Sequence, residues 1–435
     1  MEKDILVTKK LQDLKIIAKA VGVAGISKYN KEDLIKEILN QIDINERNNS
    51  RDEIVENSQN DDKEVKDSLK VEGILDLHEN GYGFLRSEGY DSGEDDVYVP
   101  PVQVRRFKLK TGDFVEGLSR EKNEKEKFNA LIYVNKVNGD TVENLRNRPD
   151  FENLTPIYPT KRLKLERDSN NISMRIMDLI SPVGKGQRGL IVASPKTGKT
   201  TLLKNIANSI RKNYPNIQVI ILLIDERPEE VTDMRRSVEG ADVVASTFDE
   251  MPQNHIRVAE IVIERAKRLV EHKKDVVILV DSITRLSRAY NVTSPYSGKT
   301  LSGGLDPLAL NGPKRFFGAA RNIEEGGSLT ILATALIETG SRMDDVIFEE
   351  FKGTGNMELK LDRSLSEMRV FPAIDIAKSG TRKDELLLSK DELSAINMIR
   401  RQLDSQENKE NTDQIIKMIR NTKSNEEFVK SIKNL

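Results

Sequence analysis

The spacing of apolar residues divides the chain into segments with different structural tendencies. Up to residue 42, apolar residues recur every three or four positions, as at Leu11 and Leu14, and this spacing predicts a small helical module over residues 1–42. Residues 43–70 carry nine acidic and five basic residues and no aromatic residue. Such a composition cannot bury enough surface to offset the entropy of ordering, so we predict an acidic disordered linker over residues 43–70.

The next segment has the texture of short strands. Residues 71–146 contain β-prone pieces separated by turns, such as 82–85 and 130–134, and five such pieces in so short a segment predict a small β-barrel. Residues 147–171 contain prolines and predict an extended connector.

Beyond the connector, apolar strands alternate with stretches compatible with helices. Near-continuous apolar strands are typical of a mainly parallel sheet with both faces covered, so residues 172–435 predict an α/β domain. Ser389 and Glu392 form the pattern of a capping box, which predicts that helices close the chain. The expected strands of the sheet are 189–193, 217–224, 241–246, 276–280 and 329–336.

Composition limits the kinds of site that the chain can carry. The 435 residues suggest about three domains. Lys and Arg number 69 and Asp and Glu 71, a formal net charge of −2, so a site for a polyanion must be local. The absence of Cys excludes disulfides and thiolate metal sites, and three scattered His leave little for a His-based site. No signal segment or 18-residue apolar run is present, so we expect a cytoplasmic protein without a membrane partner.

A phosphate-binding loop follows the first of these apolar strands. The sequence Ala193-Ser194-Pro195-Lys196-Thr197-Gly198-Lys199-Thr200 precedes the helical pattern that begins at Thr201, the context that a P-loop requires. Backbone N–H groups would cradle phosphates, Lys199 would reach the β and γ phosphates of ATP, and the Thr200 hydroxyl would bind Mg²⁺. A second Gly-Lys-Thr at 298–300 has no apolar strand before it and predicts no nucleotide site.

Two strand ends supply candidate carboxylates. Asp281 ends the strand 276–280 in a Walker B arrangement and is the expected Mg²⁺ partner; the alternative is an Asp that caps the next turn. Glu226 ends another strand, where it could polarise the attacking water. From its position alone, an ion pair with Arg227 is an equally good interpretation.

The barrel segment carries aromatic residues at strand spacing. Tyr82, Phe84 and Arg86 share one face of a strand, and Tyr98 and Asp96 could add a ring and an acceptor for a base amino group. Stacked rings beside a basic groove are how small barrels bind single-stranded nucleic acid. The alternative is that Tyr82 and Phe84 belong to the barrel core.

Taken together, these motifs closely resemble the Rho family of bacterial transcription termination factors. The resemblance rests on the barrel motif 81–86, on the motor motifs 194–200, 225–232 and 281–286, and on three further segments at 314–320, 349–356 and 369–375. It implies an OB or cold-shock-like barrel and a RecA-like P-loop domain in a homohexameric ring. It further implies an RNA-stimulated ATPase or helicase that moves along nascent RNA and dislodges RNA polymerase.

The same resemblance assigns roles to matching residues. Lys196 joins Lys199 and Thr200 at the phosphates, Glu226 activates water, Arg227 contacts nucleotide and Phe371 stacks on adenine. Arg382 resembles an arginine finger, and Arg369 likewise faces the neighbouring subunit's ATP. The segment expected beside the nucleotide comprises Gly184, Lys185, Gly186, Gln187, Arg188 and Gly189.

Two RNA sites are also implied. The primary site adds Glu126 and Phe128 to the barrel residues above. The secondary site includes Arg342, where the family more often has Lys, and since the two cations are not interchangeable donors, translocation and inhibitor response could differ. The other secondary-site residues are Lys299, Thr300, Leu301, Ser302, Gly303 and Gly304.

The sequence therefore predicts an ATP- and Mg²⁺-dependent translocase on single-stranded RNA. One alternative is a rotary or secretion ATPase with a related sheet, which would ignore RNA. Another is a non-catalytic RNA-binding regulator that holds ATP as a structural ligand, although Glu226 and Arg382 argue against it.

Overall fold

The computed structural model describes residues 68–433 except 88, 125, 143–144, 146–147 and 404–407, together with the single positions 33 and 36. The chain divides into two compact units, residues 1–69 and 70–435. The predicted helical module lies outside the described residues apart from those two positions, as does almost all of the predicted linker. The structure described below is that of the second unit.

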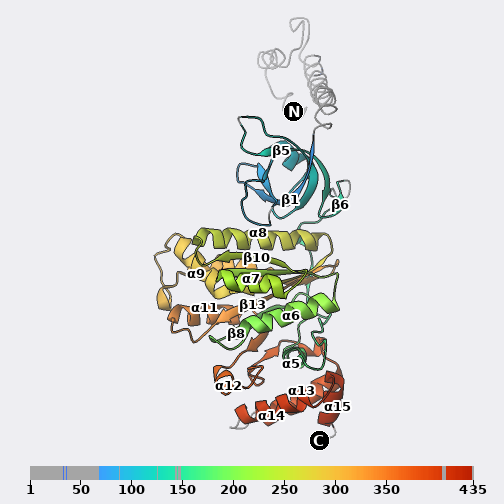
Figure 1. Cartoon of the computed structure of the whole chain (residues 1–435), viewed down its shortest axis with the longest axis vertical. Coiled ribbons are helices and arrows are strands. Elements are labelled where there is room, and N and C mark those ends of the chain that lie inside the picture. The colour runs from blue at the N-terminus through green and yellow to red at the C-terminus, as the bar shows by residue number, and fades with distance from the viewer. Residues whose placement is uncertain are drawn as a thin grey trace. The chain divides into compact units, whose positions relative to one another are not determined.

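The first part of this unit is a small closed barrel (Figure 1). Its sheet has the order β3-β2-β1-β4-β5-β6, and β3 also pairs with β5, which closes it. Alternate residues such as Leu85, Val99 and Val134 are fully buried in its core. The predicted barrel is confirmed, with one further two-residue strand that is too short to leave a pattern. The strands are β1 (Leu69–Leu77), β2 (Gly83–Arg86), β3 (Val97–Val99), β4 (Phe114–Arg120), β5 (Asn129–Val137) and β6 (Asp140–Thr141).

The second part is built on a nine-stranded sheet. From β10 through β9, β11, β13 and β8 to β14 all neighbouring strands are parallel, while β15, β12 and β7 add antiparallel edges. The predicted mainly parallel sheet is thus confirmed. The strands are β7 (Pro156–Ile157), β8 (Arg188–Ala193), β9 (Gln218–Glu226), β10 (Asp242–Thr247), β11 (Asp275–Asp281), β12 (Arg321–Ile323), β13 (Ser328–Leu336), β14 (Met357–Lys360) and β15 (Gly380–Thr381).

Helices bury both faces of this sheet. Ile191 faces one core, packed by α5, α6, α7 and the C-terminal helices, while its neighbours Leu190 and Val192 face the other, packed by α8, α9, α10 and α11. The opposite orientation of successive residues explains why the strands are apolar throughout. The helices are α4 (Pro101–Phe107), which lies on the barrel, α5 (Ile172–Ile180), α6 (Lys199–Asn213), α7 (Pro228–Ser237), α8 (Pro252–Glu271), α9 (Ile283–Thr293), α10 (Asn311–Gly318), α11 (Arg342–Lys352), α12 (Arg363–Glu367), α13 (Lys390–Leu403), α14 (Asn408–Arg420) and α15 (Asn425–Lys433).

The predicted capping box begins helix α13. Glu392 N donates to Ser389 Oγ at 3.3 Å, and Ser389 N donates to Glu392 Oε2 at 2.8 Å. Each residue therefore satisfies a backbone donor of the other.

The barrel packs directly on helix α8. Gly112 has φ +88°, and a Cβ there would lie 2.4 Å from Arg265 N, so only glycine allows this approach of the two backbones. Tyr90 Oη donates to Asp242 Oδ2 at 2.6 Å across the same joint.

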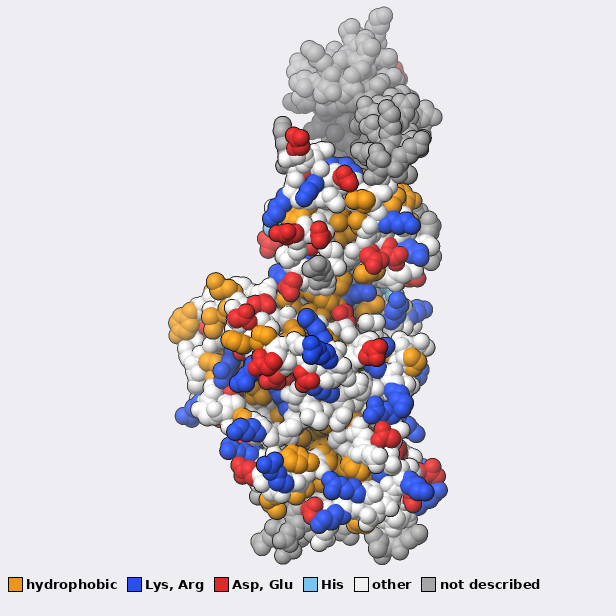
Figure 2. Space-filling model, in the orientation of Figure 1, with side chains coloured by type: hydrophobic (Ala, Val, Ile, Leu, Met, Phe, Trp, Pro, Cys, Tyr) orange, Lys and Arg blue, Asp and Glu red, His pale blue; other side chains and the backbone are white. Residues whose placement is uncertain are grey.

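Figure 2 shows basic and acidic side chains interspersed on the displayed face, as expected for a net charge near zero. Within the described part of the chain, no helix combines the length and the apolar character needed to cross a membrane.

Candidate functional site

The predicted P-loop joins the end of β8 to the start of α6. Gly198 has φ +89° and precedes Lys199, the first residue of the helix. The Thr197 hydroxyl donates to Ser194 O at 2.8 Å and fixes the turn. The first N–H groups of a helix have no partner within the helix and, together with the helix dipole, favour an anion. The loop can therefore receive phosphates.

Asp281 and Lys199 meet at this loop. Asp281 ends β11 with 1% of its surface exposed, and its Oδ1 accepts from Lys199 Nζ at 2.5 Å and from Thr334 Oγ1 at 2.8 Å. The alternative role for Asp281, a cap of the next turn, does not fit these contacts. Helix α9 is capped by Ser282 instead, whose side chain accepts from Arg285 N at 3.2 Å. The structure thus places the two residues expected at the phosphates and Mg²⁺ within contact distance.

Glu226 lies at the end of β9 beside this pair. It is 4% exposed, and its Oε2 has no hydrogen bond to a described residue. Its ion-pair partner is Arg285 Nη1 at 3.3 Å rather than Arg227, whose side chain is exposed. Burial raises the pKa of Glu226 well above its usual range, with Asp281 adding to the effect and Lys199 and Arg285 opposing it. A buried acid with a raised pKa is suited to accept a proton near neutral pH.

A cavity of about 470 Å³ adjoins the P-loop. Thr197, Gly198 and Thr201 line it together with Phe371, which has 40% of its surface exposed. Arg420 donates to the carbonyl of Phe371 at 2.7 Å and holds its backbone. An exposed ring beside a phosphate loop can stack on a nucleotide base.

The barrel rings lie outside the barrel core. Tyr82, Phe84, Tyr98 and Phe128 are all half-buried, with ring centroids 5.1–5.9 Å apart between contacting neighbours. Leu85, between two of these positions, is fully buried. The alternative that Tyr82 and Phe84 fill the core is therefore wrong, and the rings form a platform on which bases could stack.

Charged residues frame this aromatic platform. The Arg86 guanidinium lies 5.4 Å from the centre of the Phe84 ring and bonds to Asp76 and Asp96, each at 2.5 Å. Asp96 Oδ1 is buried and has no hydrogen-bond partner among the described residues. Glu126 is held by Arg120 at 2.6 Å, and this hydrogen bond lowers the pKa of Glu126 to about 2.

The comparisons with known proteins agree with this geometry. Family models match as "Rho termination factor, RNA-binding domain" over residues 71–143, "Rho termination factor, N-terminal domain" over 6–44, and "ATP synthase alpha/beta family, nucleotide-binding domain" over 173–381. The chain is 54% identical to the transcription termination factor Rho of Bacillus subtilis, covering 96% of this chain and 93% of that protein. Against Rho of Aquifex aeolicus it is 52% identical, covering 99% and 95%. The chain belongs to the Rho family of transcription termination factors.

Solved structures show the fold of the Rho motor more widely. A type III secretion system ATPase of pathogenic bacteria aligns with a TM-score of 0.53 and 21% identity, covering 66% of this chain and 88% of that one. The ATP synthase subunit NeqB of Nanoarcheaum equitans aligns with a TM-score of 0.53 and 16% identity, covering 64% and 76%. These likenesses concern the sheet and its helices, whereas the match to the Rho RNA-binding domain sets this chain apart from the rotary or secretion alternative.

Other predicted nucleotide residues of this Rho-family chain lie at the opposite edge of the sheet. Arg188 begins β8, whereas the P-loop follows its end. Arg382 N bonds to Asn356 O at 2.8 Å, and Asn356 Oδ1 accepts from Arg188 N at 2.9 Å. Burial lowers the pKa of Arg188, with Arg321 and Arg382 adding to the effect. Among the described residues, no carboxylate pairs with any of these three guanidinium groups, as expected of a site for a polyanion.

The glycine-rich turn before β8 shares that edge. Gly186 has φ +87°, and a Cβ there would lie 2.1 Å from Asn322 N, so glycine is needed for the close packing of the turn. Lys185 bonds to Asp275 at 2.5 Å, and Gln187 Oε1 accepts from Gly184 N at 3.0 Å. The turn that ends at Gly189 therefore lies away from the P-loop of its own chain.

Arg369 lies away from the edge of the sheet that holds Arg382. Its N donates to Ser366 O at 3.0 Å, and the Ser366 hydroxyl donates to Lys196 O at 2.9 Å. The backbone of Arg369 is thus on the P-loop side of this chain, near Phe371 and away from Arg382. The role of Arg369 at the neighbouring subunit's ATP stays a prediction.

The two parts of the predicted secondary RNA site lie side by side. A Cβ on Gly303, which has φ +78°, would lie 2.5 Å from Met343 N and 2.9 Å from Arg342 C. Lys299, Thr300 and Arg342 are exposed, while Leu301 and Leu305 close the loop by an isolated backbone pairing. The remaining members of this loop are Ser302 and Gly304.

The P-loop side fits Mg²⁺ bound together with phosphates. Mg²⁺ is usually held by one or two protein oxygens together with substrate phosphates and water. Thr200 and Asp281 supply such oxygens, and the described residues contain no cluster of three or more His, Asp or Glu that could hold a metal alone.

Some residues at these sites were not predicted. Arg285, beside Glu226, lies within the quoted motif 281–286, but only the packing of α9 against β9 reveals its target. His78 stacks on Tyr82 with ring centroids 4.8 Å apart and an interplanar angle of 8°. A turn histidine three residues before the aromatic motif carries no signal of its own.

Proposed function

We propose that this chain is an ATP-dependent RNA translocase of a homohexameric ring that terminates transcription in the cytoplasm by releasing nascent RNA from RNA polymerase. The ring is inferred from the separation of two half-sites. The P-loop lies at one edge of the sheet, and Arg382 lies with Arg188 at the other. β8 has six residues, which span about 20 Å at 3.3 Å per residue. One chain cannot close both halves on one nucleotide, whereas the P-loop of one copy can meet Arg382 of the next.

The chemistry follows from the P-loop half-site. Lys199 and the loop N–H groups hold the β and γ phosphates. Thr200 and Asp281 would hold Mg²⁺, which would supply positive charge beside the phosphates. Glu226 orients a water molecule and accepts its proton, for which its raised pKa is suited. Arg382 of the next copy stabilises the charge that develops on the transferred phosphoryl group. The products are ADP and phosphate.

The link from hydrolysis to RNA movement is a second cavity beside Glu226. It has a volume of about 810 Å³. Arg227 and Arg285 line it, together with Thr339, Gly340 and Ser341. The latter residues lead directly to Arg342 of the secondary RNA site. A change at the γ phosphate can therefore reach the loop that holds RNA, while the aromatic platform of the barrel loads the strand.

A subunit-mixing experiment tests the interface site. Lys199→Ala spoils the P-loop half-site and Arg382→Ala the other, so each homomeric ring should hydrolyse ATP poorly. A mixed ring places an intact P-loop next to an intact Arg382 and should regain turnover. The exposed Lys378, which lines the same cavity as Arg382, supplies the control Lys378→Ala, which should remain active alone. Failure of the mixture to regain activity would contradict a site shared between copies.

Transcript release tests the biological role. Stalled elongation complexes of RNA polymerase should release RNA when the protein is supplied with ATP. An ATP analogue that cannot be hydrolysed should give no release. Equal release with the analogue would show that binding alone suffices and would favour the non-catalytic regulator.

A further inference from the structure

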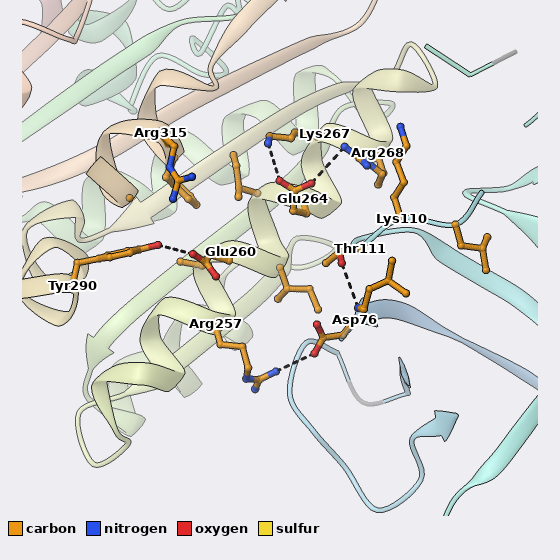
Figure 3. Close-up of a pocket in the computed structure, with 17 residues that line it drawn as sticks. Asp76, Lys110, Thr111, Arg257, Glu260, Glu264, Lys267, Arg268, Tyr290 and Arg315 are labelled. Atoms are coloured by element: carbon orange, nitrogen blue, oxygen red, sulfur yellow. Dashed lines mark hydrogen bonds and ion pairs between the residues drawn. The ribbon is translucent and has the colours of Figure 1, made fainter. Parts of the chain in front are cut away.

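A cavity lies at the joint between the barrel and the motor. Its volume is about 560 Å³, and it is bounded by the end of β1, the loop at 109–111, helix α8 and the residues that follow on α9 and α10 (Figure 3). It is separate from the P-loop cavity and from the cavity beside Glu226, with which it shares no lining residue. None of the nucleotide or RNA contacts proposed so far involves a residue that lines it.

Most of the cations around this joint cavity are paired with carboxylates. Five cations line it, and acids of the lining or directly beside it pair with four of them. Lys110 pairs with Asp150, and Arg257 pairs with Asp91 at 2.7 Å. The five cations are Lys110, Arg257, Lys267, Arg268 and Arg315.

Arg315 differs from the other cations of the cavity. Lys267 bonds to Glu264 at 2.7 Å, and Arg268 pairs with Glu271 at 3.1 Å. Arg315 is exposed, and no hydrogen bond or ion pair joins its guanidinium to any residue in the described part of the chain. Figure 3 shows it at the cavity without a dashed contact, while Tyr290 beside it donates to Glu260 at 2.9 Å. Its five N–H donors are available to a ligand.

Asp76 links the cavity to the aromatic platform of the barrel. Asp76 accepts from Arg86, which lies beside the Phe84 ring, and its other neighbour across the joint is Arg257 Nη1 at 3.8 Å. A single carboxylate thus separates the RNA-stacking face from the cations of the joint.

We propose that the joint cavity binds the phosphodiester backbone of RNA that leaves the barrel, with Arg315 as its principal phosphate contact. The proposal rests on the RNA-binding function proposed above. It adds a contact between the barrel and the motor, through which a loaded strand is passed toward the motor. Leu77, Leu109 and Phe316 supply an apolar wall against which a ribose or base can pack.

The test compares RNA of two lengths on the full-length protein. The probes are a pyrimidine oligonucleotide of about four residues, near the smallest site of such a barrel, and one of about sixteen. Arg315→Gln should weaken binding of the longer RNA only. Each phosphate contact on a single strand contributes about 0.7 to the salt slope. Raising the salt fourfold, from 50 to 200 mM, therefore costs about 2.6-fold in affinity per phosphate contact, since four to the power 0.7 is about 2.6. A variant that has lost one contact should show a salt-induced loss of affinity that is smaller by this factor.

Lys314 provides the matched control. It precedes Arg315 but bonds to Glu350 at 2.7 Å and does not line the cavity, so Lys314→Gln should leave both affinities and the salt slope unchanged. Arg315→Lys, which keeps the charge, should restore most of the slope. ATP turnover without RNA should be unchanged in all three variants. This result would show that the variants fold.

Two outcomes would overturn the proposal. One is an unchanged affinity and salt slope of Arg315→Gln for the longer RNA. The other is an equal loss for both lengths, which would place the effect on the barrel face. Failure of the unaltered protein to bind either RNA would instead contradict the RNA-binding function itself, so the two failures are distinguishable.

Discussion

Replacement of Glu226 by Gln isolates the proposed proton acceptor from the rest of the site. The two side chains have nearly the same volume, and the position is 4% exposed, so packing is retained. Arg285 loses a partner at 3.3 Å but keeps Asp225 at 3.7 Å. A general base contributes about 10² to 10⁴ in rate, which at 1.36 kcal/mol per decade raises the barrier by about 2.7 to 5.4 kcal/mol.

Phosphate release under saturating ATP and RNA measures this loss. ATP binding, followed with a fluorescent analogue, should be almost unchanged because the substitution removes none of the groups proposed to hold the phosphates. Thermal stability should not fall, because the change removes a carboxylate whose ionised form is disfavoured by burial. Glu229→Gln is the control, an exposed glutamate three positions away, and should retain full turnover. A kcat of Glu226→Gln within twofold of the unaltered protein would refute the role of Glu226.

Three further predictions concern the same chain. Lys199→Ala should lower phosphate release by about 10²-fold or more, because a donor to the developing charge is lost; an unchanged rate would remove the P-loop assignment. Tyr82→Ala combined with Phe84→Ala should weaken RNA binding by about 30-fold or more, at 1 to 3 kcal/mol per stacked base, and leave ATP affinity intact, as a binding titration would show. Because burial raises the pKa of Glu226, kcat should rise with pH through a value above the ordinary glutamate pKa of about 4.3, and Glu226→Gln should lose this acid limb of the pH–rate profile.

Most of the fold could be predicted because its elements are long and strongly patterned. The strand 276–280 is apolar throughout and lies in the middle of the sheet, as a strand covered on both faces must. The capping box at Ser389 and Glu392 forms as its pattern predicts. The edges were not predicted, since β6 and β7 have two residues each and are defined by the strands beside them rather than by their own sequence.

The candidate site was predicted only where a motif is flanked by a recognisable strand or helix. Lys199 and Asp281 were expected at one site, and they meet at 2.5 Å because their strands end at the same edge of the sheet. Burial was not predictable for Glu226, whose partner turned out to be Arg285 because helix α9 packs beside β9. The separation of Arg382 from the P-loop depends on the pairing of β15 with β14, a long-range contact without a local signal.

The measurement that tests the central claim most directly is the rate of ATP hydrolysis by the full-length protein under three conditions. These are no nucleic acid, single-stranded pyrimidine-rich RNA, and DNA of the same sequence. The account predicts slow turnover alone, strong stimulation by RNA and little by DNA. Turnover that is indifferent to RNA would contradict an RNA translocase, and the absence of turnover under all three conditions would contradict an ATP-hydrolysing enzyme.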